Sequence, residues 1–240
     1  EPDGYTLLHI ANLNAISQSL FKSVPYDIIG DFAQISTVSY TPMLFLTGRN
    51  SPFNSVKDLL AEANANPGKF TIGVGVLGST QHLTAELFKA TTRQDLTIVP
   101  FNSNGNLMSA VARGEVTVIV ELITPVLAPI RAGMVKGLAL SSGKRFAGLP
   151  TVPTLMESGF VDYEIQSWGM IGAPARTPAP IVERLSRDSI AGLAQPEVQK
   201  KAHDAGITIV GSTPREAREL LIAETARWRK IIQAARIEPQ

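Results

Sequence analysis

The sequence predicts an α/β protein with mainly parallel sheets, and three observations support this class. Short apolar and β-branched runs alternate with amphipathic segments of helical spacing along the whole chain, as in proteins built from βα units. Of the 240 residues, 44% are hydrophobic and 18% are charged, and this charged share is below the roughly 25% of an average soluble domain. No repeat or polar linker divides the chain, which is typical of a compact fold.

Nine short apolar or β-branched runs are the expected strands. They cover residues 5–10, 34–39, 43–47, 70–74, 96–99, 116–120, 137–141, 170–172 and 207–210. This number of strands suits two small sheets as well as one large sheet.

Two of the expected helices have readable ends. Ser55 can cap a helix that runs to about residue 65 and stops at Pro67-Gly68, because its hydroxyl can accept from the first free amides. Thr213, with Pro214 and Glu216 after it, predicts the start of a closing helix over 215–235. That helix carries apolar side chains at helical spacing, which we expect in the core: Leu220, Leu221, Trp228, Ile231 and Ile232.

Charge and composition exclude several classes of function. The 22 Lys and Arg against 21 Asp and Glu leave a net charge of +1, which argues against a nucleic-acid partner. With no cysteine, disulfides, thiolate metal sites and a cysteine nucleophile are excluded. The most apolar stretch, 116–130, is interrupted by Glu121, Pro125 and Pro129, so it does not reach the roughly 20 apolar residues of a membrane span. Residues 1–8 have neither the basic start nor the apolar core of a secretory signal.

Residues 70–83 read as a strand, a glycine-rich turn and the start of a helix. Gly73, Gly75 and Gly78 match the G-x-G-x-x-G dinucleotide motif, which also needs an acidic residue at the end of the next strand. Asp95 has the right distance but precedes that strand. The same glycines fit P-loop spacing, but Ser79 stands where the phosphate-binding Lys must be. A NAD-binding oxidoreductase therefore stays an alternative, and no cofactor is expected in the preferred interpretation.

The dinucleotide motif and the P-loop bind anions by the same physical principle, and the turn at 78–80 follows it too. Glycines allow a tight turn, and free amides at a helix N-terminus favour an anion there. Gly78, Ser79 and Thr80 would offer amides and hydroxyls without a cation, a donor set that suits a small mono- or dicarboxylate. The alternative interpretation is that Ser79 only caps its own helix.

Further polar residues follow or precede apolar strands, where open α/β sheets bind ligands. They are Asn12 and Asn14 after the first strand, Asn102, Ser103 and Asn104 after the fifth, Glu121 after 116–120, and Ser167-Trp168 before 170–172. Taken singly, each of the Asn and Ser residues is more typical of a turn than of a site. Their recurrence at strand ends is the better argument for ligand binding.

The sequence contains no recognisable catalytic or metal-binding apparatus. It has no G-x-S-x-G motif, and its three histidines, His9, His82 and His203, lack metal-ligand spacing. His82 and Glu86 lie four residues apart, a spacing more typical of a surface pair than of a metal site. Catalytic and metal-binding residues are therefore not expected.

The whole chain resembles the extracytoplasmic solute receptors of tripartite tricarboxylate transporters, the Bug or TctC family. The resemblance is carried by the order and spacing of several short stretches. These are 2–8 (PDGYTLL), 25–27 with 31–32, 55–59 with 65–69, 78–80 with 82–83 and 86–88, 99–101, 132–133, 149–154 (LPTVPT), and 167–168 with 173–174.

The resemblance implies a periplasmic receptor of the type II binding-protein fold, in which two α/β lobes close on a small organic acid and present it to membrane subunits. By analogy, 1–45 plus 170–240 would form one lobe and 46–169 the other, with crossings near 43–47 and 168–173. The turn Gly78-Ser79-Thr80 would hold a ligand carboxylate from the second lobe, in agreement with the anion-binding interpretation.

The chain also departs from the family pattern. The usual Tyr-Lys-Gly is Phe101-Asn102-Ser103 here, the usual Asp is Glu121, and Asn14 stands where His is common. The strand-helix-strand segment that normally precedes Asp-Gly-Tyr-Thr is missing from this sequence, so the first lobe is expected to be incomplete. Since an open sheet edge invites pairing with another chain, self-association through this lobe is a further expectation, as is a fragment that binds nothing.

Overall fold

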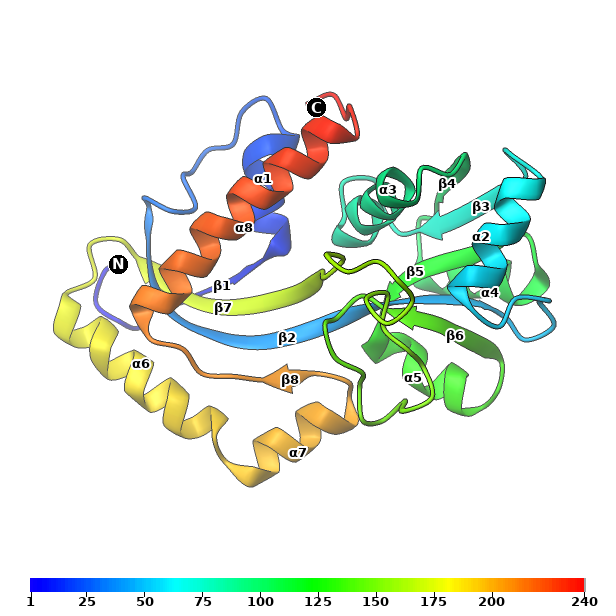
Figure 1. Cartoon of the computed structure of the whole chain (residues 1–240). Helices are drawn as coiled ribbons and strands as arrows, with labels where there is room; N and C mark the ends of the chain where they lie inside the picture. The colour runs from blue at the N-terminus through cyan, green and yellow to red at the C-terminus, as the bar shows by residue number, and fades with distance from the viewer. Residues whose placement is uncertain (240) are drawn as a thin grey trace. The chain divides into compact units, whose positions relative to one another are not determined.

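The computed structural model describes residues 1–239 and divides into two compact units (Figure 1). Unit 1 comprises Glu1–Tyr40 and Ser167–Gln240, and unit 2 comprises Thr41–Gln166. The chain leaves unit 1 within strand β2 (Phe32–Gly48) and returns at the start of strand β7 (Gln166–Pro174). The sequence placed these two boundaries near residues 45 and 170.

Within residues 1–239, unit 1 has a small sheet and four helices. Strand β1 (Leu8–Ala11) pairs with β7, from Leu8↔Gly172 to Ala11↔Gly169, and β8 (Thr208–Ile209) pairs with β2 through Ser39↔Ile209. The helices are α1 (Asn12–Leu20), α6 (Ala179–Leu193), α7 (Pro196–Asp204) and α8 (Pro214–Ala234). Helix α1 packs beside α8 (Figure 1). Of the core residues expected on α8, Leu221, Trp228, Ile231 and Ile232 are buried, whereas Leu220 is only partly buried.

The α/β class is confirmed, but strand direction in unit 1 differs from the mainly parallel expectation. The pairs β1/β7 and β2/β8 are both antiparallel. Each pair joins strands far apart in the sequence rather than the two ends of one strand–helix–strand unit. No crossover helix therefore requires these neighbours to be parallel.

Unit 2 contains three consecutive βα units. Strand β3 (Phe70–Val74) is parallel to β4 (Leu96–Pro100) and to β5 (Val118–Leu122), and β2 is antiparallel to β5 and to β6 (Val135–Leu140). Helices α3 (Thr80–Thr92), α4 (Asn104–Arg113) and α5 (Ile123–Arg131) follow β3, β4 and β5, and α2 (Val56–Ala65) precedes β3. Because the three strands are parallel, the N-termini of α3, α4 and α5 all lie at one edge of the sheet.

Apolar side chains cover both faces of the unit 2 sheet. Alternate residues of β2 point to opposite faces: Phe45 joins one cluster, whereas Leu44 and Leu46 join the other. The first cluster receives side chains from α2 and α3, including Leu59 and Phe88, and the second receives them from α4 and α5. The parallel strands are thus buried between helix layers, which fixes the edge where the three helices begin.

Strand β2 replaces two strands that the sequence predicted separately, 34–39 and 43–47. The expected break falls at Thr41-Pro42, and β2 continues through it. Proline lacks an amide donor and is tolerated where a strand does not need one. Residue 42 lies next to the point where β2 passes from unit 1 into unit 2, so the missing donor falls between two sheets.

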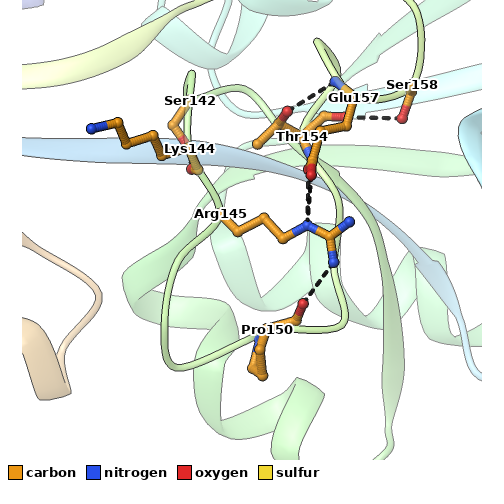
Figure 2. A network of polar contacts seen from close by, with 7 residues as sticks. All are labelled: Ser142, Lys144, Arg145, Pro150, Thr154, Glu157 and Ser158. Carbon is orange, nitrogen blue, oxygen red and sulfur yellow. Dashed lines mark hydrogen bonds and ion pairs between the residues drawn. The ribbon is translucent and has the colours of Figure 1, made fainter.

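The long connection after β6 is held by a polar network (Figure 2). The Arg145 guanidinium donates through Nε to both carboxylate oxygens of Glu157, at 3.0 and 2.9 Å, and through Nη1 to the Pro150 carbonyl at 2.8 Å. Glu157 Oε2 also accepts from the Thr154 amide at 2.8 Å. The Arg145 hydrogen bond is the main reason that the pKa of Glu157 lies below its usual range. The 149–154 stretch therefore has a structural role in this loop.

Candidate functional site

The turn between β3 and α3 is built mostly from its own residues. Gly78 has a φ of 81°, in the left-handed region that glycine adopts without strain. Its amide donates to His82 Nδ1 at 3.1 Å, and the Ser79 amide donates to the Val76 carbonyl at 3.1 Å. Ser79 is the N-cap of α3, and its Oγ accepts from the His82 amide at 3.2 Å. The turn is therefore closed before any ligand arrives.

His82 is the residue of this turn whose role the sequence did not reveal. It is only 6% exposed, and its Nε2 lies 3.6 Å from Glu86 Oε1. Because Nδ1 accepts the Gly78 amide, Nε2 carries the proton in the neutral ring. The surface pair predicted for His82 and Glu86 is thus wrong in its location: the imidazole is buried and fastens the glycine turn to the helix.

The donors that remain for an anion are the amides at the start of α3. Thr80 and Gln81 hold the first two helical positions, where amides have no intrahelical acceptor, and no other acceptor within residues 1–239 takes them. The Ser79 hydroxyl still has its own hydrogen to donate, and Thr80 is 9% exposed. Ser79 therefore caps the helix, and its hydroxyl hydrogen is still available to a ligand.

Glu121 lies inside β5, not after it as the sequence placed it, because β5 pairs with β2 as far as Met43↔Leu122. Its side chain is 1% exposed. Oε1 accepts from Gln81 Nε2 at 2.9 Å and from the Leu122 amide at 2.7 Å, while Oε2 has no partner within residues 1–239. Through its bond to the Gln81 side chain, this carboxyl is fastened to the first turn of α3.

Burial raises the pKa of the Glu121 carboxyl above its ordinary value, although the hydrogen bonds from Gln81 and Leu122 lower it in part. The folded protein therefore binds this proton more tightly than the unfolded chain. As pH rises from about 4.5 through the raised pKa, the free energy of unfolding decreases. We expect E121Q to be more stable than the parent at pH 7 and to lose that advantage below pH 4.5. Urea unfolding at a series of pH values measures this, and parallel curves would contradict it.

Asn102 and Ser103 lie at the same edge of the sheet, at the start of α4. Ser103 Oγ accepts from the Asn106 amide at 3.2 Å, and Asn102 Oδ1 accepts from Asn106 Nδ2 at 2.8 Å. The Phe101 amide donates to the Val74 carbonyl at 2.9 Å, which ties the ends of β4 and β3 together. The parallel pairing of β3 and β4 thus brings 102–103 to the same edge of the sheet as the Gly78 turn. Both side chains, however, already bond to Asn106 of α4.

Four predicted residues belong to unit 1. Asn12 and Asn14 lie in the first turn of α1 rather than in a loop, and Ser167 and Trp168 lie within β7 rather than before it. Asn12 Oδ1 accepts from the Trp168 amide at 2.7 Å, and Asn14 Oδ1 accepts from the Ala11 amide at 2.9 Å. The indole of Trp168, 3% exposed, donates to Glu224 Oε2 at 3.1 Å. The structure brings Asn12 and Trp168 together as a buried contact between α1 and β7.

The structure leaves the dinucleotide-binding alternative without an acidic residue for the ribose at Asp95. Asp95 lies just before β4, and its carbonyl accepts from the Gly68 amide ahead of β3. Both residues therefore sit at the amino ends of their strands, opposite the Gly78 turn.

A cavity of about 560 Å³ also lies at that opposite end, where Lys69, Phe70 and Thr117 line it, and it has no part in the anion site. Residues 1–239 contain no cluster of three metal-ligating side chains.

The chain is similar to known receptor proteins over nearly its whole length. The family model described as "Tripartite tricarboxylate transporter family receptor" matches residues 1–237. Protein BugT of Bordetella pertussis is 30% identical over 233 residues, which are 96% of this chain and 72% of BugT. A protein from the tcbD-tcbE intergenic region of Pseudomonas sp. strain P51 is 30% identical over 236 residues, or 98% of this chain and 70% of that protein.

Two solved structures share the fold over the whole chain. The structure of R. palustris Rpa4515 with adipate has a TM-score of 0.88 and 31% identity, and the alignment covers 100% of this chain and 81% of that one. The periplasmic binding protein BugD has a TM-score of 0.84 and 26% identity, with the same coverage.

No helix within residues 1–239 has the length and apolar character that crossing a membrane requires.

Proposed function

This chain belongs to the tripartite tricarboxylate transporter receptor family, and we propose that its unit 2 binds a carboxylate group at the N-terminus of α3. Membership makes the protein a solute-binding receptor of a tripartite transporter. The observation that carries the proposal is the pair of unpartnered amides of Thr80 and Gln81 at a turn that His82 and Ser79 already close. A preformed site of this kind binds an anion without a cationic side chain.

The ligand is a small organic acid, and a dicarboxylate is the first candidate. Adipate, a dicarboxylate, is bound by the 31% identical Rpa4515. The remaining predicted contacts of unit 2, Asn102, Ser103 and Glu121, lie at the same edge of the sheet as the α3 amides. They offer neutral hydrogen-bonding groups and one carboxyl, so they would set selectivity for the rest of the molecule. The other predicted residues, Asn12, Asn14, Ser167 and Trp168, belong to unit 1.

The protein would act in the periplasm, hand its ligand to the membrane subunits of the transporter, and catalyse no reaction. BugD, which shares its fold, is a periplasmic binding protein. The family consists of receptors, and the proposed site offers donors for a ligand without a nucleophile next to a base.

Titration calorimetry tests this function. The protein is titrated with succinate, glutarate, adipate, L-malate and L-aspartate, and separately with NAD⁺ and NADH. We expect heat and a raised melting temperature with at least one acid and with neither nucleotide. Binding of a nucleotide alone would overturn the receptor function and favour the oxidoreductase alternative.

Self-association through unit 1 is a second proposal, supported by the position of β1. This strand ends the strand order of its sheet, and Tyr5 and Leu7 just before it are 92% and 48% exposed. An exposed edge with apolar neighbours can pair with the same edge of a second copy. Light scattering would show a dimer that L7K weakens, whereas a monomer at all concentrations would refute it.

A further inference from the structure

Glu121 Oε2 is a buried acceptor that the fold leaves without a donor. The other oxygen of the same carboxyl takes two donors, Gln81 Nε2 and the Leu122 amide, and the residue is 1% exposed. Buried polar atoms in native proteins are almost always paired, and an unpaired carboxylate oxygen costs more than a neutral group. An atom in this state calls for a partner that is not part of this chain.

The position of Oε2 indicates what that partner is. Gln81 belongs to the first turn of α3 and carries one of the two free amides. Its side chain donates to Glu121 Oε1, so the carboxyl lies within the reach of one glutamine side chain from the anion site. A ligand whose carboxylate sits on the Thr80 and Gln81 amides would bring its neighbouring atoms to Oε2. Two independent observations, the free helix amides and the orphaned oxygen, thus point to one bound molecule.

The chemistry of Oε2 limits what that molecule can carry. An ionised carboxylate accepts hydrogen bonds and cannot donate them. A hydroxyl or ammonium group would satisfy it, a methylene group would leave it unpaired, and a second carboxylate would repel it. We infer that Glu121 Oε2 accepts a hydrogen bond from a hydroxyl or ammonium group of the bound acid, so that the receptor selects hydroxy or amino acids over unsubstituted ones. This inference rests on the proposed function.

The variant E121Q isolates this interaction because its amide has one preferred orientation. The two donors that now meet Oε1, from Gln81 and Leu122, require the amide oxygen in that place. The amide nitrogen then takes the place of Oε2 and presents a donor where the parent has an acceptor. The substitution keeps the size of the side chain and inverts its hydrogen-bonding character toward the ligand.

The experiment compares L-malate, L-aspartate and succinate by calorimetry at pH 7.5, in the parent and in E121Q. We expect the parent to bind malate or aspartate about tenfold or more tightly than succinate, the scale of one hydrogen bond to a charged group. We expect E121Q to lose that preference, with succinate binding held or improved. The exposed Glu115→Gln, at the ion pair with Arg113, is the matched control and should change none of the three affinities.

The possible outcomes are distinct. Succinate binding as tight as malate and aspartate in the parent would overturn the inference and leave the proposed function intact. An equal loss of all three acids in E121Q would also overturn it, since that result indicates a structural role. No binding of any acid by a folded parent protein would overturn the proposed function itself, and the inference with it.

Discussion

The double variant S79A/T80A is expected to bind its carboxylate ligand about 1–3 kcal/mol more weakly, or roughly 5- to 150-fold in Kd, the usual cost of lost hydrogen bonds to a charged group. Both hydroxyls stand at the start of α3, one on its N-cap residue and one on its first helical residue. The backbone donors remain in the variant, so binding should weaken without vanishing. Titration calorimetry with the ligand of highest affinity measures the change.

The control for this variant must separate ligand contacts from helix capping. Ser79 caps α3 through its bond to the His82 amide, and losing such a cap costs about 0.5–2 kcal/mol of stability. Ser55 caps α2 in the same way through the Asp58 amide, so S55A loses a cap away from the site. We expect S55A to lower stability and leave affinity unchanged. Equal affinity losses in S55A and S79A/T80A would mean that the hydroxyls act only through folding.

Phe88→Ala is expected to reduce the free energy of unfolding by about 3–5 kcal/mol, as for other buried aromatic residues. Phe88 is fully buried in unit 2, and its ring centroid lies 4.8 Å from that of Phe45 and 6.3 Å from that of Tyr163. Removing it leaves a cavity between α3 and the sheet. For a protein of this length the loss corresponds to a melting temperature lower by roughly 6–20 °C, which scanning calorimetry measures.

Val161→Ala provides the comparison within the same unit. Val161 is 70% exposed, and such surface positions usually change stability by less than about 0.5 kcal/mol. If Phe88→Ala destabilised the protein no more than Val161→Ala, the aromatic cluster would not be the core of unit 2. Since α3 carries the candidate site on its first turn, we also expect Phe88→Ala to weaken ligand binding.

The sequence predicts a structural feature correctly where the residues that determine it lie within a few positions of each other. Strand β3 was predicted over 70–74 and is found there, because a turn of glycines ends it. The caps at Ser55 and Thr213 were predicted from residue order, and both side chains accept the expected amides. These features depend on neighbours within a few residues, so the chain alone determines them.

Features that depend on distant residues were less predictable. Glu121 reads as the residue after an apolar run, yet pairing with β2 draws it into β5 and buries it. His82 reads as half of a surface pair with Glu86, although its spacing of four from Gly78 is a signal that could have suggested the buried contact. The bond of Asn12 to Trp168 joins residues 156 positions apart, and no local pattern predicts it.

A crystal structure of the protein with its tightest-binding acid would show directly whether a carboxylate binds at the N-terminus of α3. We expect a ligand carboxylate oxygen within hydrogen-bonding distance, about 2.7–3.2 Å, of the amide nitrogens of Thr80 and Gln81. A bound acid whose carboxylates lie elsewhere, with both amides left to water, would contradict it.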